Sequence, residues 1–273
     1  MQDPALQLLT TSPAAPMAEL WRLIIHGPAG PSWNMAVDEA LLRQAADANA
    51  MLTGSEDSPA VRASSCTTST SPLYPGAVLR IYEWDTPAVS IGYFQPTTVV
   101  PAGRPSVRRY TGGGLVDHER DVTYTIALPR CHPIASLSTS ESYESIHLGV
   151  RDALEAIGIA AEVVPCCDDG DSAACFNKAV KFDLKAGSLK LAGAAQRRSR
   201  DAFLHQGSVL LPPQSTPEAA AAINAQLRAA LAEHLPRTLG FIAVAAELTP
   251  DEVILARGLD ATRYSSADWN ERR

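Results

Sequence analysis

The chain has 273 residues, of which 46% are hydrophobic, and its formal net charge is −7. A chain of this length and composition can bury a large core, as one domain or as a domain with a small appendage. The negative charge argues against sequence-independent binding of nucleic acid. No apolar run is long enough to span a bilayer.

Residues 1–17 are predicted to be a disordered leader ahead of a single catalytic-size domain at 18–273. The leader has no basic start and no sustained apolar centre, so it is not a secretory signal, and we expect a cytoplasmic protein. Five cysteines, an odd number in a chain without such a signal, indicate free thiols rather than a disulfide framework. The adjacent Cys166 and Cys167 have no second spaced pair, which argues against a zinc site.

The first elements are a strand at 21–25 and a helix at 32–46, which the spacing of apolar residues predicts. Asp38 and Glu39 fall in the first turns of this helix, where the helix dipole favours negative charge, and we expect them to be structural. Residues 51–76 are rich in Ser, Thr and Pro, a composition that predicts a mobile surface insert. Strands are expected at 78–82 and 88–91.

Two arginines and three glycines lie close together between Val107 and His118. Successive glycines leave backbone N–H groups uncovered by a Cβ and let the chain press close to a ligand, while arginine is the usual partner of carboxylate or phosphate. Residues 121–128 alternate in polarity and predict a half-buried strand. The segment therefore predicts a strand, a glycine turn and a strand, although a flexible hairpin with solvated arginines fits the same pattern.

A helix is expected to begin at Ser138, which forms a capping box with Glu141, and to end at Gly158. A short strand at 161–164 and an acidic loop follow. The alternation of apolar residues at 180–184, the Ala186-Gly187 turn and residues 189–193 then predict a hairpin.

Cys175 and Lys190 flank this hairpin and are fifteen residues apart, so the fold can bring loop and return strand together. A nearby ammonium group favours the thiolate, and a thiolate can exchange one acyl thioester for another. Attack by an amine then gives an amide without a need for ATP. The alternative is that Cys175 is a small buried hydrophobe and Lys190 a surface charge, and the residues by themselves favour this alternative.

The C-terminal region, 216–273, is predicted to form helices packed on the core. A strand at 202–211 precedes it, and its His205 is expected to be a hydrogen-bonded structural residue. Thr216 and Thr249, each followed by proline, predict helix starts, and Thr249 is expected to form a full capping box with Glu252. The final segment, 263–270, is expected to pack against the sheet.

The run Arg-Arg-Tyr-Thr-Gly-Gly-Gly at 108–114, with the following His118, closely resembles the signature turn of the lipoate–protein ligase and octanoyltransferase family. The first helix, the Ser-Ile-Gly-Tyr-Phe-Gln run at 90–95 and the closing segment are also similar to that family. The Cys-Phe pair at 175–176, followed by the Gly-x-x-Lys-x-x-Gly-x-Ala-Gln-x-Arg pattern at 187–198, resembles the branch of octanoyltransferases with a cysteine nucleophile. One departure is Gly114, which completes a ligase-like triplet where one transferase group often has Arg.

The resemblance implies a mixed α/β (α+β) catalytic core like those of biotin ligases and class II aminoacyl-tRNA synthetases. It implies transfer of an octanoyl or lipoyl group from acyl carrier protein to a specific lysine of a lipoyl domain or of the glycine cleavage H protein. Such a protein would need no cofactor, would bind neither nucleic acid nor membrane, and is expected to be a monomer. Cys175 and Lys190 would be the catalytic residues. The substrate-binding residues would be Arg108, Arg109, Thr111, Gly112, Gly113, Gly114, His118, Gly193, Ala194, Ala195 and Gln196.

Two alternatives remain open on the sequence. An ATP-dependent lipoate–protein ligase on the same fold would use ATP and magnesium and would be indifferent to Cys175. A non-catalytic scaffold would bind a lipoyl domain without turnover.

Overall fold

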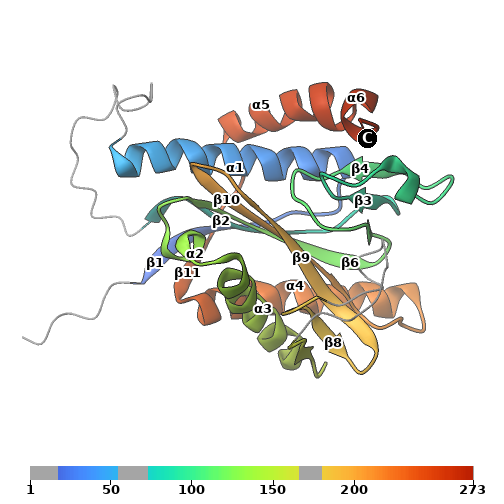
Figure 1. Cartoon of the computed structure of the whole chain (residues 1–273). Coiled ribbons are helices and arrows are strands. Elements are labelled where there is room, and N and C mark those ends of the chain that lie inside the picture. The colour runs from blue at the N-terminus through green and yellow to red at the C-terminus, as the bar shows by residue number, and fades with distance from the viewer. Residues whose placement is uncertain (1–17, 55–72, 166–179, 273) are drawn as a thin grey trace, which may run out of the picture.

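An eight-stranded mixed sheet forms the centre of the molecule in the computed structural model, which describes residues 18–54, 73–165 and 180–272 (Figure 1). The strand order is β11-β1-β2-β6-β10-β9-β8-β7. β1 is parallel to both of its neighbours, and the remaining pairs are antiparallel. The strands are β1 (Glu19–Ile25), β2 (Leu73–Tyr82), β6 (Asp121–Pro129), β7 (Glu162–Val163), β8 (Leu184–Ala186), β9 (Leu189–Arg198), β10 (Ala202–Leu210) and β11 (Phe241–Ala245).

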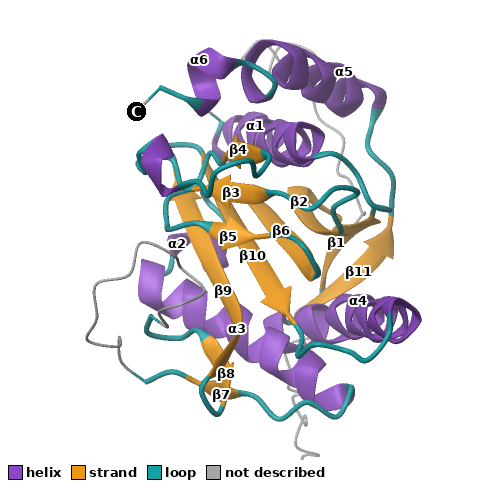
Figure 2. Ribbon diagram, turned by 90° about the vertical axis from the view of Figure 1, so that its right-hand side faces the viewer, coloured by secondary structure: helices purple, strands orange, loops and turns teal. Residues whose placement is uncertain are grey.

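Helices cover both faces of this sheet (Figures 1 and 2). α1 and α5 lie on one face, where Met35, Leu41 and Leu259 belong to one buried cluster. α3 and α4 lie on the other, where Ile146 and Leu231 belong to a second cluster. The helices are α1 (Pro31–Thr53), α2 (Pro133–Ser136), α3 (Thr139–Ala156), α4 (Pro217–Leu239), α5 (Pro250–Leu259) and α6 (Ala267–Asn270), with a 3-10 turn at Thr97–Val99 and a π-helical turn at Asp260–Tyr264.

The strand at 121–128 was predicted to be half-buried, and that prediction is wrong. β6 occupies a central position between β2 and β10, and every residue in it is buried. Its Thr123 and Thr125 are polar, but their hydroxyls bond to Asp121 and Asp38 respectively. The polar face of β6 is therefore covered by α1 and by the functional site instead of water, and its polar groups are satisfied by hydrogen bonds.

The segment around the glycines is not a simple hairpin. β4 (Ser106–Arg108) and β5 (Val116–Asp117) do not pair with each other, because both pair with β3 (Val89–Ile91) in a separate three-stranded sheet. The glycine turn thus connects the two outer strands of this small sheet. Figure 2 shows the small sheet beside the eight-stranded one, near α1 and α6.

Helix starts agree with the sequence better than helix ends do. Ser138 and Thr249 both form the expected capping boxes. α1 continues beyond residue 46 to Thr53 and ends at Gly54, which is left-handed with φ of 66°. The expected insert at 51–76 is correspondingly shorter, since its first and last residues belong to α1 and β2, and residues 55–72 lie outside the described part of the chain.

The two carboxylates of α1 fasten it to the rest of the molecule. Asp38 forms an ion pair with Arg80 of β2 at 2.7 Å, and both side chains are buried. Glu39 accepts hydrogen bonds from Arg263 and from the Tyr264 hydroxyl. The C-terminal segment therefore packs on α1 and on the small sheet, rather than on the eight-stranded sheet as its sequence suggested.

Candidate active site

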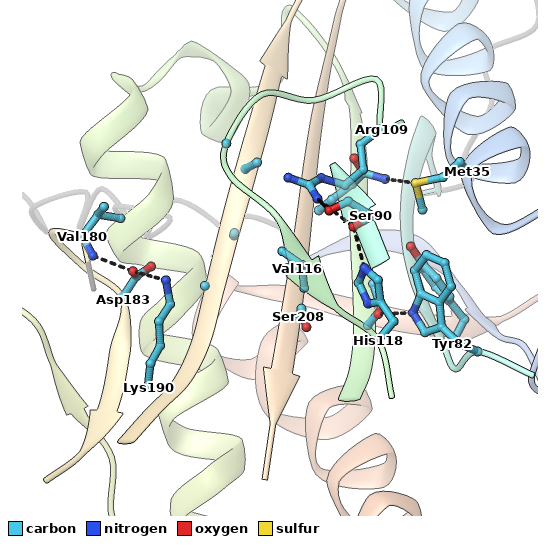
Figure 3. A pocket seen from close by; sticks show the side chains of 18 residues that line it. Met35, Tyr82, Ser90, Arg109, Val116, His118, Val180, Asp183, Lys190 and Ser208 are labelled. Carbon is cyan, nitrogen blue, oxygen red and sulfur yellow. Dashed lines mark hydrogen bonds and ion pairs between the residues drawn. The ribbon is translucent and has the colours of Figure 1, made fainter. Parts of the chain in front are cut away.

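A cavity opens between the glycine turn, the edge of α1 and the strands β9 and β10 (Figure 3). Its wall combines apolar side chains with a few polar groups, which is typical of a small-molecule site. The lining residues are Met35, Tyr82, Trp84, Ser90, Arg109, Gly113, Val116, His118, Thr123, Val180, Asp183, Lys190, Gly193, Ala194, Ala195, Gln206, Gly207 and Ser208.

Lys190 reaches this cavity from the start of β9. Its Nζ lies 2.7 Å from Oδ2 of Asp183, and the two side chains are 6% and 0% exposed. The Tyr143 hydroxyl of α3 donates to the other oxygen of Asp183 at 2.5 Å, and the Ala194 N–H donates to that hydroxyl. The ammonium is therefore held beside a carboxylate that is itself fixed on both oxygens.

A strained turn brings Asp183 to this place. Phe182 has φ of 73°, which is uncommon for a residue other than glycine. Its carbonyl lies 2.7 Å from Nδ1 of His147, and its N–H bonds to Val164. The backbone N–H of Val180 donates to Asp183 Oδ2 at 2.7 Å. The backbone of this turn therefore fixes the direction in which the Asp183 carboxylate points.

Burial changes the titration of the groups around Asp183. Desolvation raises the pKa of Tyr143 well above its ordinary value, and the negative charge of Asp183 adds to the rise. Desolvation also lowers the pKa of His147 to about 4, so this ring is neutral at pH 7. Tyr143 therefore remains a hydrogen-bond donor to the carboxylate across the physiological range.

A glycine in β9 makes room for the lysine side chain. A Cβ at Gly193 would lie 2.8 Å from Cε and 2.9 Å from Nζ of Lys190. No substituent fits there unless the lysine moves away from Asp183. Ala194 and Ala195 follow in the same strand and also line the cavity, so three of the residues predicted for binding stand together with Lys190.

The glycine turn is held from within by Arg109. One nitrogen of its guanidinium donates to the carbonyls of Gly112 and Gly114, at 3.0 and 2.7 Å. The other nitrogen donates to the carbonyl and hydroxyl of Ser90. A Cβ at Gly92 would lie only 2.0 Å from the Gly113 carbonyl oxygen, so the turn packs directly on the backbone of this residue.

The remaining predicted binding residues occupy several supporting positions. Arg108 is fully buried, and it donates to carbonyls at Gly92, Gln95 and in the C-terminal segment. The Thr111 hydroxyl donates to Gln206, which lines the cavity. Gln196 bonds to Ser142 and to His205. His118 lines the cavity between Ser90 and Asp121.

The sequence analysis assigned no role in the site to three of its polar residues: Asp183, Ser90 and Asp121. Asp183 stands between apolar residues in a hairpin arm, where an acidic residue usually faces solvent. Ser90 meets His118 only through the pairing of β3 with β5, for which the local sequence carries no signal. Asp121 lies three residues after His118, so the His-x-x-Asp spacing at 118–121 was a local signal for that contact. Cys175, like Cys166 and Cys167, lies outside the described residues.

Two further observations concern ligands and membranes. Within the described ranges, no three His, Cys, Asp or Glu side chains are grouped so that they could hold a metal ion. Among the helices in those ranges, none has both the length and the apolar character needed to cross a membrane.

The fold and the cavity together define a catalytic core of the lipoate–protein ligase type. The structure of lipoate-protein ligase A bound with ATP is similar, with a TM-score of 0.67, 23% identity and coverage of 92% of this chain and 98% of that one. The bi-partite lipoate protein ligase from Thermoplasma acidophilum has a TM-score of 0.61, with 20% identity, covering 93% of this chain and 96% of that one. At these identities the likeness establishes the fold.

The model of the lipoyl protein ligase A/B catalytic domain matches residues 30–234, and the chain belongs to this family. Octanoyltransferase LipM of Brevibacillus brevis is 28% identical to it, covering 93% of this chain and all of the relative. Octanoyltransferase LipM of Staphylococcus epidermidis is 30% identical, covering 71% of this chain and 67% of the relative.

Proposed function

We propose that this protein is an octanoyltransferase of protein lipoylation. Relatives named octanoyltransferase LipM match along 93% of the chain, and the family match covers the residues that build the cavity. The observation that carries the proposal is the buried Lys190–Asp183 pair beside the glycine turn, in a cavity with an apolar wall. An apolar wall suits a medium-chain acyl group, and a fixed positive charge favours a thiolate or an oxyanion in acyl transfer.

The proposed donor is octanoyl-acyl carrier protein, and the proposed nucleophile is the Cys175 thiolate. The sulfur attacks the carbonyl carbon of the donor thioester, the carrier thiol leaves with a proton, and a thioester forms on Cys175. The amine of an acceptor lysine then attacks this thioester, which gives an amide and returns the thiol. Lys190 favours the thiolate by its positive charge and assists proton transfer.

The position of Val180 supports this assignment. Val180 lines the cavity, and it follows Cys175 by five residues in the chain. An extended chain spans at most about 3.6 Å per residue, so this separation is compatible with a Cys175 thiol that acts at the cavity.

The proposed acceptors are lipoyl domains or the glycine cleavage H protein. A structural relative has been studied together with its E2 lipoyl domain, which is compatible with such a partner for this fold. No cofactor enters the proposed reaction, since thioester and amine react without activation by ATP. We propose a monomer that acts in the cytoplasm.

The test is transfer without ATP. Purified protein, octanoyl-carrier protein and a lipoyl domain should give an octanoylated domain, measured by intact mass, and Cys175→Ala should abolish the product. Formation of product only when free octanoate and ATP are supplied, with release of pyrophosphate, would instead establish the ligase alternative that Gly114 keeps open. Binding of the lipoyl domain without any product would establish the scaffold alternative.

A further inference from the structure

A second polar cluster lies across the cavity from Lys190 (Figure 3). Oγ of Ser90 lies 2.6 Å from Nε2 of His118, and Nδ1 of His118 lies 2.9 Å from Oδ2 of Asp121. All three side chains are buried, with relative exposures of 0%, 4% and 3%. The ring of Trp84 stacks on His118 with centroids 3.8 Å apart and so fixes the plane of the imidazole.

The direction of each hydrogen bond in this cluster follows from Asp121. Its Oδ2 also accepts from the hydroxyls of Thr123 and Ser208, so it acts as a carboxylate acceptor. His118 therefore donates from Nδ1, and its Nε2 accepts the hydroxyl hydrogen of Ser90. The Ser90 oxygen in turn accepts from Arg109 at 2.6 Å. Each donor in this series then faces an acceptor, while the second oxygen of Asp121, Oδ1, is buried without a hydrogen-bond partner in the part of the chain that the structure describes.

This series of hydrogen bonds, from Asp121 through His118 and Ser90 to Arg109, ends at the glycine turn. The guanidinium of Arg109 that bonds to Ser90 also draws in the carbonyls of Gly112 and Gly114. In a trans peptide the C=O and the following N–H point in opposite directions, so the N–H groups of Gly113 and Leu115 are turned away from Arg109. Gly113 lines the cavity. Its N–H is therefore our candidate donor to the oxygen of a bound acyl group.

We propose that Ser90, His118 and Asp121 are positioning residues that act through Arg109 to aim the backbone donors of the glycine turn at the oxyanion of acyl transfer. This inference rests on the proposed function, adds Ser90 and Asp121 to its machinery and gives His118 a specific role there. Serine, histidine and aspartate in this order also compose a hydrolytic triad. That role does not fit Ser90, because its oxygen is fully buried and engaged by the Arg109 cation.

Ser90→Ala tests this series of hydrogen bonds, because it removes the Ser90 hydroxyl without adding bulk. We expect kcat of octanoyl transfer to fall about tenfold to a hundredfold, because misplaced oxyanion donors act on the transition state. The KM for octanoyl-carrier protein should change less than about threefold, because substrate contacts remain. The control is Ser145→Ala, which removes a half-buried serine hydroxyl that bonds to the Glu141 carbonyl on α3, away from the cavity. Its kcat should remain within about twofold of wild type.

Replacement of His118 separates positioning from simple packing. His118→Gln can offer an amide oxygen to the Ser90 hydroxyl, and His118→Ala cannot. The glutamine variant should therefore recover part of kcat over the alanine variant at equal thermal stability. Equal loss in both variants would contradict the inference.

The rate at which Cys175 becomes acylated distinguishes the two levels of the proposal. If wild-type protein forms no adduct, the proposed function fails. If wild type forms the adduct and Ser90→Ala forms it equally fast, only the positioning chain fails. Hydrolysis of an octanoyl ester by Cys175→Ala that disappears in Cys175→Ala/Ser90→Ala would also overturn it, in favour of Ser90 as a nucleophile.

Discussion

Asp183 binds Lys190 with one oxygen and the Tyr143 hydroxyl with the other, and nothing of its side chain is exposed. A buried carboxylate is costly unless charge and hydrogen bonds compensate it, and both are present here. The resulting arrangement fixes an ammonium group at a point where acyl chemistry is proposed. The free-energy cost of burying Asp183 is thus accompanied by a functional gain, the fixed position of the Lys190 ammonium.

Asp183→Asn should lower octanoyl transfer more than about tenfold, because the lysine loses the charge that orients it. It should also lower the free energy of unfolding by about 3 kcal/mol, since the buried ammonium loses the negative charge of Asp183. Denaturant titration and steady-state rates measure the two effects. In a Lys190→Met background the same substitution should cost much less stability, and equal costs in the two backgrounds would show that the pair is not coupled.

At the scale of elements, the wall of the cavity depends on close contact between strands. Gly207 of β10 pairs directly with Tyr124 of β6, and the ring of this tyrosine lies over the glycine. A Cβ at position 207 would lie 2.2 Å from the ring. The tyrosine hydroxyl reaches His205 from this position, at 3.1 Å.

Gly207→Ala should therefore destabilise the protein by about 1–3 kcal/mol through overpacking. Gly258→Ala is the matched control, because a Cβ there would meet nothing within 4 Å and the residue lies inside α5. This control should be stabilising by about 0.5–1 kcal/mol, owing to the helix propensity of alanine. Thermal unfolding of the two variants measures the contrast, and a similar Tm for both would contradict the packing argument.

The sequence predicted those features that depend on neighbours along the chain. The capping boxes at Ser138 and Thr249 were predicted correctly, and so was the turn at Gly187 between β8 and β9. The full burial of β6 and the pairing of β4 and β5 with β3 were not, because they depend on which elements arrive from elsewhere. Alternating polarity describes a strand with one polar face, and it does not say what covers that face.

The same distinction applies to the site. Arg109, Gly113, His118 and Lys190 lie in motifs that resemble the family's, and they meet in one cavity. Asp183 and Tyr143 are forty residues apart and join only where α3 crosses the β8–β9 hairpin. Sequence spacing gives no hint of that crossing. The supporting atoms of a site are therefore harder to predict than the reacting ones.

At the scale of the whole molecule, buried histidines link folding to pH. Burial lowers the pKa of His147 to about 4 and that of His205 well below its usual value of 6.5. Both rings are fully buried and neutral in the folded protein, and both become exposed on unfolding. Between about pH 6.5 and pH 4 the unfolded chain thus binds more protons than the folded protein does.

The free energy of unfolding should consequently be largest above pH 6.5 and should fall as the pH drops toward 4. Each histidine contributes a slope of at most about 1.4 kcal/mol per pH unit in that window. Denaturant titrations at pH 7.5, 6 and 5 measure the total slope. His147→Asn should flatten it by about one histidine's share, and an unchanged slope in this variant would contradict the assignment.

The central claim is that an acyl group passes through a thioester on Cys175 beside Lys190, without ATP. Intact-mass measurement after mixing the protein with octanoyl-carrier protein alone tests it most directly. The account predicts one added octanoyl group that is removed by neutral hydroxylamine, maps to Cys175 and forms more slowly in Lys190→Met. Two results would contradict it: transfer of octanoate to a lipoyl domain by Cys175→Ala at the wild-type rate, or an octanoyl group on a residue other than Cys175.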